Sequence, residues 1–248
     1  MAAEQKRRHC KNQNYMQEIF GREINLIGID KFNILQSKTV AVFGLGGVGS
    51  FIAEGLCRAG IGKLVLCDGD KIDESNINRQ LFALNSTVGR YKTEVAKERL
   101  KDINPDAEIV IYTKRFDATT KDEFDFSGVD YIADAIDTVT SKLLLISLAK
   151  EKDIPIISCM GTGNKLYGGA FKITDIKKTN VCPLCKVMRK ELKARGITNV
   201  DVLYTEEEPT RAIKGDLSTR KVPPASISFV PSVAGLKMCE YIVHKFID

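Results

Sequence analysis

The sequence contains very little histidine and no long apolar run. Only His9 and His244 occur among 248 residues, and each lies close to one end of the chain. A mechanism that needs a core histidine as acid, base or metal ligand is therefore difficult to build. No apolar run approaches the roughly 18 residues that a membrane span requires. Residues 1–11 are polar and basic, so we expect no secretory signal.

Cysteine is present, but not in the pattern of a disulfide framework. The total of seven is odd, and several lie in strand-like runs, which indicates the free thiols of a cytoplasmic protein. Cys182-Pro-Leu-Cys185 is the only C-x-x-C, and Cys159 and Cys239 stand alone, so a four-ligand zinc site would need an unusual combination. We interpret Cys182 and Cys185 as small, partly buried side chains at a helix start, with a redox role as the minor alternative.

The composition is that of an ordinary globular protein, but its charge is uneven. Apolar residues make up 44% and charged residues 28%, and the net charge is +5. Between Phe171 and Arg195 eight cations face two anions, an excess larger than that of the whole chain. The cations of this segment are Lys172, Lys177, Lys178, Lys186, Arg189, Lys190, Lys193 and Arg195.

Strand and helix patterns alternate through the first 160 residues. We expect strands at 38–43, 63–68, 107–112, 130–134 and 154–159, and helices at about 50–59, 93–103 and 138–150. Alternation of this kind predicts an α/β fold, with a mostly parallel sheet and helices on both faces.

After residue 160 the pattern changes to a C-terminal α+β elaboration. We expect antiparallel strand material at 167–173, a basic helix at 183–195, a strand at 200–204, a mobile polar loop at 206–224 and an amphipathic helix at 231–246. We therefore expect one domain over residues 1–248, with a core at 20–160 and an elaboration at 161–248 that faces the substrate.

A glycine-rich turn joins the first strand to the first helix. Gly44, Gly46 and Gly49 fit G-x-G-x-x-G, which lets backbone N–H groups approach a phosphate at a helix start. A turn needed only for packing would have the same pattern. Asp68 and Asp70 follow Gly44 by 24 and 26 residues, where an acidic side chain can bind a ribose hydroxyl. These features alone suggest NAD.

Three further features favour a triphosphate with Mg²⁺ over hydride transfer. The run Asn76–Gln80 follows the acidic strand end, Lys92 comes next, and Asp134 and Asp137 end the fourth strand. Strand ends of an open α/β sheet converge on one crevice, so these groups can meet there. Arg79 and Lys92 would neutralise phosphate oxygens, and Asp137 would hold the metal ion. Each charge alone is typical of a solvated surface, so the prediction depends on their joint placement.

Four segments in order resemble the superfamily of MoeB, ThiF and the ubiquitin-activating enzymes. They are GLGGVGS, DGDKIDESNINRQ, the lysine context VGRYK, and DAIDT, and the resemblance covers about residues 20–159. It implies a Rossmann-like fold and ATP-dependent adenylation of a carboxylate, with release of pyrophosphate. The scarcity of histidine agrees, because a carboxylate is already ionised at pH 7 and needs no general base.

The resemblance also implies a role for each matching residue. Arg22, within Phe20–Glu23, matches the arginine that a neighbouring subunit contributes to the phosphates in homodimers, although Ile19 replaces a second arginine found in many relatives. The implied catalytic residues are Arg79, Lys92, Asp137 and Arg22, with Asp137 beside the metal ion. The implied nucleotide-binding residues are Gly44, Gly46, Gly47, Gly49, Asp68, Asp70, Asn78 and Gln80.

Segments of the last third resemble one branch of this superfamily, the TcdA (CsdL) tRNA threonylcarbamoyladenosine dehydratases. They are residues 181–197, 204–209 and 225–235, and with them the resemblance covers nearly the whole chain. It implies that ATP activates the carboxylate of this modified base in tRNA. Attack by the ureido oxygen then expels AMP and closes an oxazolone ring.

The basic helix is compatible with a tRNA partner but does not decide the function. Its cations Lys186, Arg189, Lys190 and Lys193 share one face, which could contact phosphates or simply be solvated. The buried side would hold Leu184, Val187, Met188 and Leu192.

Two alternative functions stay open at this point. One is an adenylyltransferase that activates a ubiquitin-like sulfur carrier, and the other is a non-enzymatic nucleotide-binding or sulfur-relay scaffold. The partners expected are tRNA bearing threonylcarbamoyladenosine, a second copy of the chain and a sulfur-transfer protein.

Overall fold

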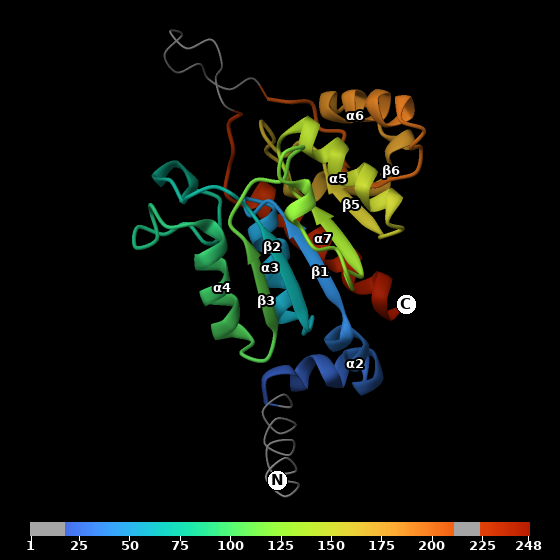
Figure 1. The fold of residues 1–248 in the computed structure, drawn as a ribbon. Helices are drawn as coiled ribbons and strands as arrows, with labels where there is room; N and C mark the ends of the chain where they lie inside the picture. The colour runs from blue at the N-terminus through green and yellow to red at the C-terminus, as the bar shows by residue number, and fades with distance from the viewer. Residues whose placement is uncertain (1–17, 211–223) are drawn as a thin grey trace, which may run out of the picture.

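A seven-stranded sheet forms the centre of the molecule (Figure 1). The computed structural model describes residues 18–210 and 224–248. The strands are β1 (Thr39–Phe43), β2 (Lys63–Cys67), β3 (Glu108–Tyr112), β4 (Tyr131–Asp134), β5 (Ile156–Cys159), β6 (Phe171–Asp175) and β7 (Asp201–Thr205), in the order β3-β2-β1-β4-β5-β7-β6. All pairs are parallel except β6 with β7, which confirms the predicted α/β class.

The strand order places a crevice beside the glycine-rich turn. The chain passes from β1 to β2 and β3 on one side, and then returns to place β4 and β5 on the other side of β1. Val42 of β1 lies opposite Leu66 of β2 and Ala133 of β4, so the carboxyl ends of these strands share one edge. Ligands of open α/β sheets bind at such a switch point.

Helices cover both faces of the sheet, so the strands β1, β2 and β4 read as nearly continuous apolar runs. One face carries α2 (Ile29–Ser37), α3 (Gly49–Arg58), α4 (Lys92–Ile103) and α7 (Phe229–Ile247), with residues 18–27 also helical. The other carries α5 (Val139–Glu151) and α6 (Pro183–Ala194). No described helix has the length and apolar character that crossing a bilayer requires.

The observed elements match the predicted ones closely in the core and less closely after it. The antiparallel material expected at 167–173 is β6, which begins at Phe171 and pairs with β7. Helix α7 begins at Phe229, two residues before the predicted start, because Pro231 is tolerated in a first turn. Of the predicted loop at 206–224, residues 206–210 and 224 lack regular structure, and residues 211–223 lie outside the described residues.

The prediction that Val187 lies on the buried side of α6 is wrong. Its exposed fraction is 46%, whereas Cys185, Met188 and Leu192 are fully buried and Leu184 is partly buried. The spacing i, i+3, i+7 of the buried three defines the apolar stripe, and cysteine occupies it as a small hydrophobic side chain.

A buried carboxylate joins α3 to α4 and makes stability depend on pH. Glu54 accepts hydrogen bonds from Arg58 and Arg99. Burial alone would raise the pKa of Glu54, but the two guanidinium groups lower it below its ordinary value. The folded chain then binds this proton more weakly than the unfolded chain, so protonation favours unfolding.

We therefore expect the free energy of unfolding to fall as the pH drops below about 4.3, the ordinary pKa of glutamate. Urea denaturation of the wild type and of Glu54→Gln between pH 3 and 7 would measure this. The difference in stability between the two proteins should shrink at low pH, and a constant difference would contradict the assignment.

Candidate functional site

The turn after β1 can be formed only with glycine at two of its positions. Gly44 has a φ of +87°, and a Cβ there would lie 2.7 Å from the Ala135 carbonyl oxygen. A Cβ at Gly49 would lie 1.7 Å from the Gly44 carbonyl oxygen. The Ser50 N–H of α3 donates to the Gly46 carbonyl at 3.1 Å, whereas the N–H groups of Gly46, Gly47 and Gly49 have no acceptor among the described residues. These free amides at the start of α3 give the turn the form of an anion-binding site.

The other predicted glycines and Gln80 lie at the same place. A Cβ at Gly47 would meet the Pro231 ring of α7 at 3.0 Å. A Cβ at Gly46 would approach only Gln80 Nε2, at 3.9 Å, so this side of the turn is open. Gln80 itself is buried. The turn is therefore held by α7 on one side while its amides stay accessible on another.

Asp68, which directly follows β2, stabilises the turn through hydrogen bonds. Its Oδ2 accepts the Leu45 N–H at 2.7 Å, and its Oδ1 accepts the Asp70 N–H at 2.8 Å. Burial raises the pKa of Asp68, although Lys92 and the two amides oppose the rise. Both carboxylate oxygens have backbone partners, so Asp68 holds the turn against the end of β2.

Asp70 is the centre of a charged cluster. Lys92 Nζ lies 3.1 Å from Asp70 Oδ2 and 3.7 Å from Asp68 Oδ2, and Arg115 Nη2 lies 2.8 Å from Asp70 Oδ1. Burial would raise the pKa of Asp70, but Arg115 and Lys92 lower it below its ordinary value. Lys92 is only 7% exposed, whereas Asp70 is 44% exposed and can accept a further hydrogen bond.

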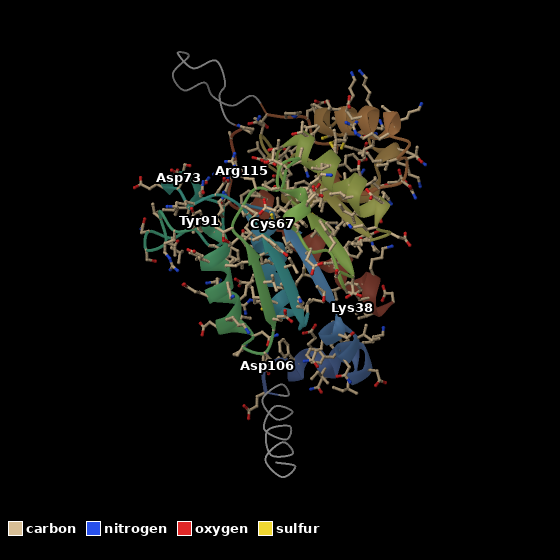
Figure 2. The ribbon with its side chains drawn as sticks, in the orientation of Figure 1. Lys38, Cys67, Asp73, Tyr91, Asp106 and Arg115 are labelled. Atoms are coloured by element: carbon tan, nitrogen blue, oxygen red, sulfur yellow. The ribbon has the colours of Figure 1, made fainter. Side chains whose placement is uncertain are left out.

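Arg115 is a member of this cluster that the sequence patterns do not indicate. It follows the end of β3 by three residues and lies with Asp73 at the upper edge of the sheet (Figure 2). It belongs to no motif, so only its position after a parallel strand could have marked it.

The run after β2 forms a short 3-10 turn, η1 (Glu74–Asn76), which presents Arg79. Arg79 Nη1 donates to the Ser75 carbonyl at 2.8 Å and to Asn78 Oδ1 at 2.9 Å. Asn78 Nδ2 donates to the Ser226 carbonyl at 3.1 Å, which ties this run to the segment before α7. Arg79 forms no ion pair with any carboxylate in residues 18–210 or 224–248, so its charge is available for a phosphate.

The two aspartates after β4 have different surroundings. Asp134 is fully buried, and its Oδ2 pairs with Lys142 Nζ at 2.9 Å and accepts the Ser158 hydroxyl. Asp137 is exposed, and within residues 18–210 and 224–248 its one hydrogen-bond donor is the Thr138 hydroxyl, at 3.2 Å. Of this pair, Asp137 is the carboxylate free to meet Mg²⁺. One carboxylate together with phosphate oxygens suits that ion, and no cluster of three or more His, Cys, Asp or Glu occurs within the described ranges.

Arg22 lies away from this edge. It lines a hollow of about 440 Å³ with Glu23, Arg58 and Asp102. Arg58 ends the ten-residue helix α3, whose start forms the turn, so Arg22 lies near the opposite end of a helix about 15 Å long. Figure 2 shows Asp106, in the loop after α4, at the opposite end of the sheet from Arg115.

The cysteine pair lies at the start of α6. Cys182 and Cys185 are buried and carry free thiols. The neighbouring Cys185 thiol lowers the pKa of Cys182, while Cys182 and burial raise the pKa of Cys185. The position at a helix start is as predicted, but both side chains are buried and not partly buried as expected. No third or fourth zinc ligand joins it among the residues described.

Comparisons with known proteins identify the family to which the chain belongs. A model of the ThiF family matches residues 20–247. The chain is 42% identical over 236 residues to the tRNA threonylcarbamoyladenosine dehydratase of Bacillus subtilis (strain 168), covering 90% of this chain and 92% of that one. It is 33% identical to the enzyme of that name from Escherichia coli (strain K12) over 76% of this chain and 73% of that one.

Solved structures agree with the sequence comparison. The crystal structure of Escherichia coli tRNA N6-threonylcarbamoyladenosine dehydratase superposes with a TM-score of 0.84 at 28% identity, covering 94% of this chain and 95% of that one. A second structure of that enzyme, in complex with ATP, gives the same TM-score over 93% and 94% of the two chains.

Proposed function

The chain belongs to the ThiF family, and from this premise we propose that it is an ATP-dependent tRNA threonylcarbamoyladenosine dehydratase. The main support is the arrangement of the site: the glycine turn, Arg79, Lys92 and Asp137 all follow the carboxyl ends of parallel strands. In addition, the chain is related over 90% of its length to such a dehydratase. These groups suit a nucleoside triphosphate and a substrate carboxylate.

The site explains how the carboxylate is activated without a general base. The turn amides receive phosphate oxygens, Asp70 accepts a ribose hydroxyl, and Lys92 and Arg79 neutralise the charge that develops on the phosphates. A carboxylate oxygen of the substrate attacks the α-phosphorus and pyrophosphate leaves. The ureido oxygen then attacks the activated carbonyl, AMP leaves with the bridging oxygen, and the oxazolone ring closes as a urea N–H proton is lost to water. Mg²⁺, held by Asp137, would supply further charge neutralisation at the phosphates.

A direct test of this function follows the modified nucleoside. The protein is incubated with ATP, Mg²⁺ and tRNA bearing threonylcarbamoyladenosine, and the nucleosides are then digested and weighed. We expect the modified nucleoside to lose one water only when ATP is present. An unchanged nucleoside, with pyrophosphate exchange at the C-terminus of a carrier protein, would favour the adenylyltransferase. If the protein does not bind ATP, both enzymatic hypotheses fail and the non-enzymatic scaffold is the hypothesis that remains.

We propose further that the active species is a homodimer in which the phosphates receive Arg22 of the partner subunit. Two observations support this. Arg22 lies by Arg58, at the end of α3 away from the turn, and apolar side chains are exposed on two elements that a second copy could cover. Residue Leu26 is 84% exposed near α2, and Phe229 and Leu236 of α7 are 47% and 51% exposed.

Mixing two inactive variants tests this arrangement. Arg22→Ala and Lys92→Ala should each be inactive, but a mixed dimer contains one site with both residues intact. If subunits exchange freely, activity should recover to about one quarter of the wild-type value, because half of the dimers are mixed. A mixture that stays inactive, or a mass near that of one chain by light scattering, would contradict the proposal.

The remaining assignments follow from the same function. We propose a single domain over residues 1–248, with the ATP-binding core at 20–160 and the elaboration at 161–248 facing the tRNA, acting in the cytoplasm where its substrate is found. A sulfur-transfer protein is the second candidate partner, and co-purification under salt of physiological strength would test it.

A further inference from the structure

A group of exposed lysines defines a positively charged surface on α6 and the short turn η4 (Ile176–Lys178) before it. We call it the lysine face, and its members are Lys177, Lys178, Lys186, Lys190 and Lys193. All five are exposed, and none forms an ion pair with a carboxylate of the described residues. Long side chains with nitrogen tips project outward from α6, away from the sheet (Figure 2).

The nearby charges are already paired, which leaves the lysine face uncompensated. Lys172 Nζ lies 2.8 Å from Glu206, and Arg195 Nη1 lies 2.9 Å from Glu191. The helical spacing places Arg189 on the same face, but it is partly buried and donates to the Thr179 carbonyl at 2.7 Å. Asp175, the other anion of this segment, accepts the Lys177 backbone N–H at 2.8 Å and forms no ion pair with a described lysine. The five lysines therefore have no ion-paired carboxylate among the described residues.

The packing of α6 fixes the direction in which these lysines point. Cys185, Met188 and Leu192 face the core beneath the helix, so Lys186 and Lys190 must face the solvent. The three lysines of α6 lie within two helical turns, a span of about 10 Å. This is close to the Debye length at physiological salt, about 8 Å, so their fields add at a bound polyanion.

Helix α5 connects the helix that carries the lysine face with the nucleotide site. Helix α6 packs on α5, at the upper end of the molecule in Figure 1. Arg195, at the end of α6, lines a hollow of about 520 Å³ together with Thr119 and Thr140. Thr140 belongs to the first turn of α5, three residues after Asp137, so a chain bound to α6 can continue towards the carboxylate that faces the phosphates.

We propose that the lysine face binds the phosphate backbone of the tRNA substrate and so positions the modified base at the nucleotide site. This inference rests on the proposed function. Five lysines without ion-pair partners, on α6 and η4, match a polyanion, whose condensed counterions they would release on binding. Phosphate contacts of this kind set position and affinity without reading sequence.

The test removes three of these charges together. The triple variant Lys186→Gln, Lys190→Gln and Lys193→Gln should raise the KM for tRNA by about tenfold or more at low salt and leave kcat and the KM for ATP near wild type. The slope of log Kd for tRNA against log salt should fall by roughly 0.7 to 0.9 for each lysine that no longer neutralises a phosphate.

A matched variant controls for the loss of positive charge as such. Lys31→Gln, Lys97→Gln and Lys150→Gln remove three exposed lysines from α2, α4 and α5, and this variant should keep the wild-type KM for tRNA. If both triple variants have the same KM and salt slope, the lysine face does not bind tRNA. If the α6 variant keeps its affinity for tRNA and loses affinity for an acidic protein, the lysine face binds a protein and the proposal is wrong.

Failure of this inference is distinguishable from failure of the proposed function. If the wild type removes water from the modified nucleoside and the α6 variant does so with an unchanged KM for tRNA, the function stands and the surface is wrong. If the wild type does not convert the nucleoside under any condition, the proposed function fails, and with it the inference.

Discussion

Replacing Lys92 by alanine should lower the rate of ATP-dependent turnover by about 10²- to 10³-fold, the usual cost of removing one preorganised group that stabilises developing charge. Lys92 is 7% exposed and lies between Asp68 and Asp70, so no solvent cation can take its place with the same geometry. The protein should stay folded, because Arg115 still compensates Asp70 and Asp68 keeps its backbone partners.

Single-turnover formation of AMP with saturating ATP would measure this effect without the influence of product release. Lys97→Ala is the matched control, because Lys97 lies on the same helix α4 and is exposed. The control should keep the wild-type rate. A near-wild-type rate for Lys92→Ala would remove this residue from the catalytic set, and a loss of far-UV circular dichroism would show that the defect is one of folding.

Replacing Lys142 by methionine should destabilise the protein by about 3–5 kcal/mol, the usual cost of leaving a buried charge without its partner. Lys142 is 1% exposed and Asp134 is fully buried, and the pair lies between α5 and β4 beneath the site. Asp134 Oδ1 also accepts the Ile136 N–H at 3.0 Å, which fixes the turn leading to Asp137. Catalysis should therefore weaken together with stability.

Urea denaturation compares this variant with Lys150→Met, which replaces an exposed lysine of the same helix and should change stability little. Adding Asp134→Asn to Lys142→Met removes the uncompensated charge and should restore part of the lost stability. If Lys142→Met unfolds at the wild-type urea concentration, the buried pair does not hold the turn in place.

The glycine turn was predictable from the sequence because its chemistry is local. Backbone geometry requires glycine at positions 44 and 49, so the requirement is visible in the sequence as the spacing of the two glycines. The parallel core was predictable for a similar reason, since strands buried on both faces leave unbroken apolar runs.

The different contacts made by the acidic residues were not predictable from the sequence. Asp68 and Asp70 differ by two positions, but only the folded backbone shows that Asp68 receives two amides and Asp70 receives two cations. Likewise, Asp134 is removed from the site by Lys142, a partner on the next helix that no motif marks.

Contacts across long sequence separations account for the remaining differences. Arg115 reaches Asp70 from a loop 45 residues away, and the turn of Gly47 is backed by Pro231, from the other end of the chain. The choice of Cys185 over Val187 for the buried stripe depends on the exact rotation of α6, which apolar character alone does not define.

The step on which the proposed function depends is attack by a carboxylate oxygen of the substrate on the α-phosphorus of ATP. Transfer of an oxygen isotope tests it most directly, with tRNA whose threonylcarbamoyl carboxylate carries ¹⁸O at both oxygens. We predict that the AMP formed with the cyclised nucleoside contains one ¹⁸O atom, because AMP leaves with the oxygen that joined it to the carbonyl. Formation of ADP with labelled inorganic phosphate, or of unlabelled AMP, would contradict this step.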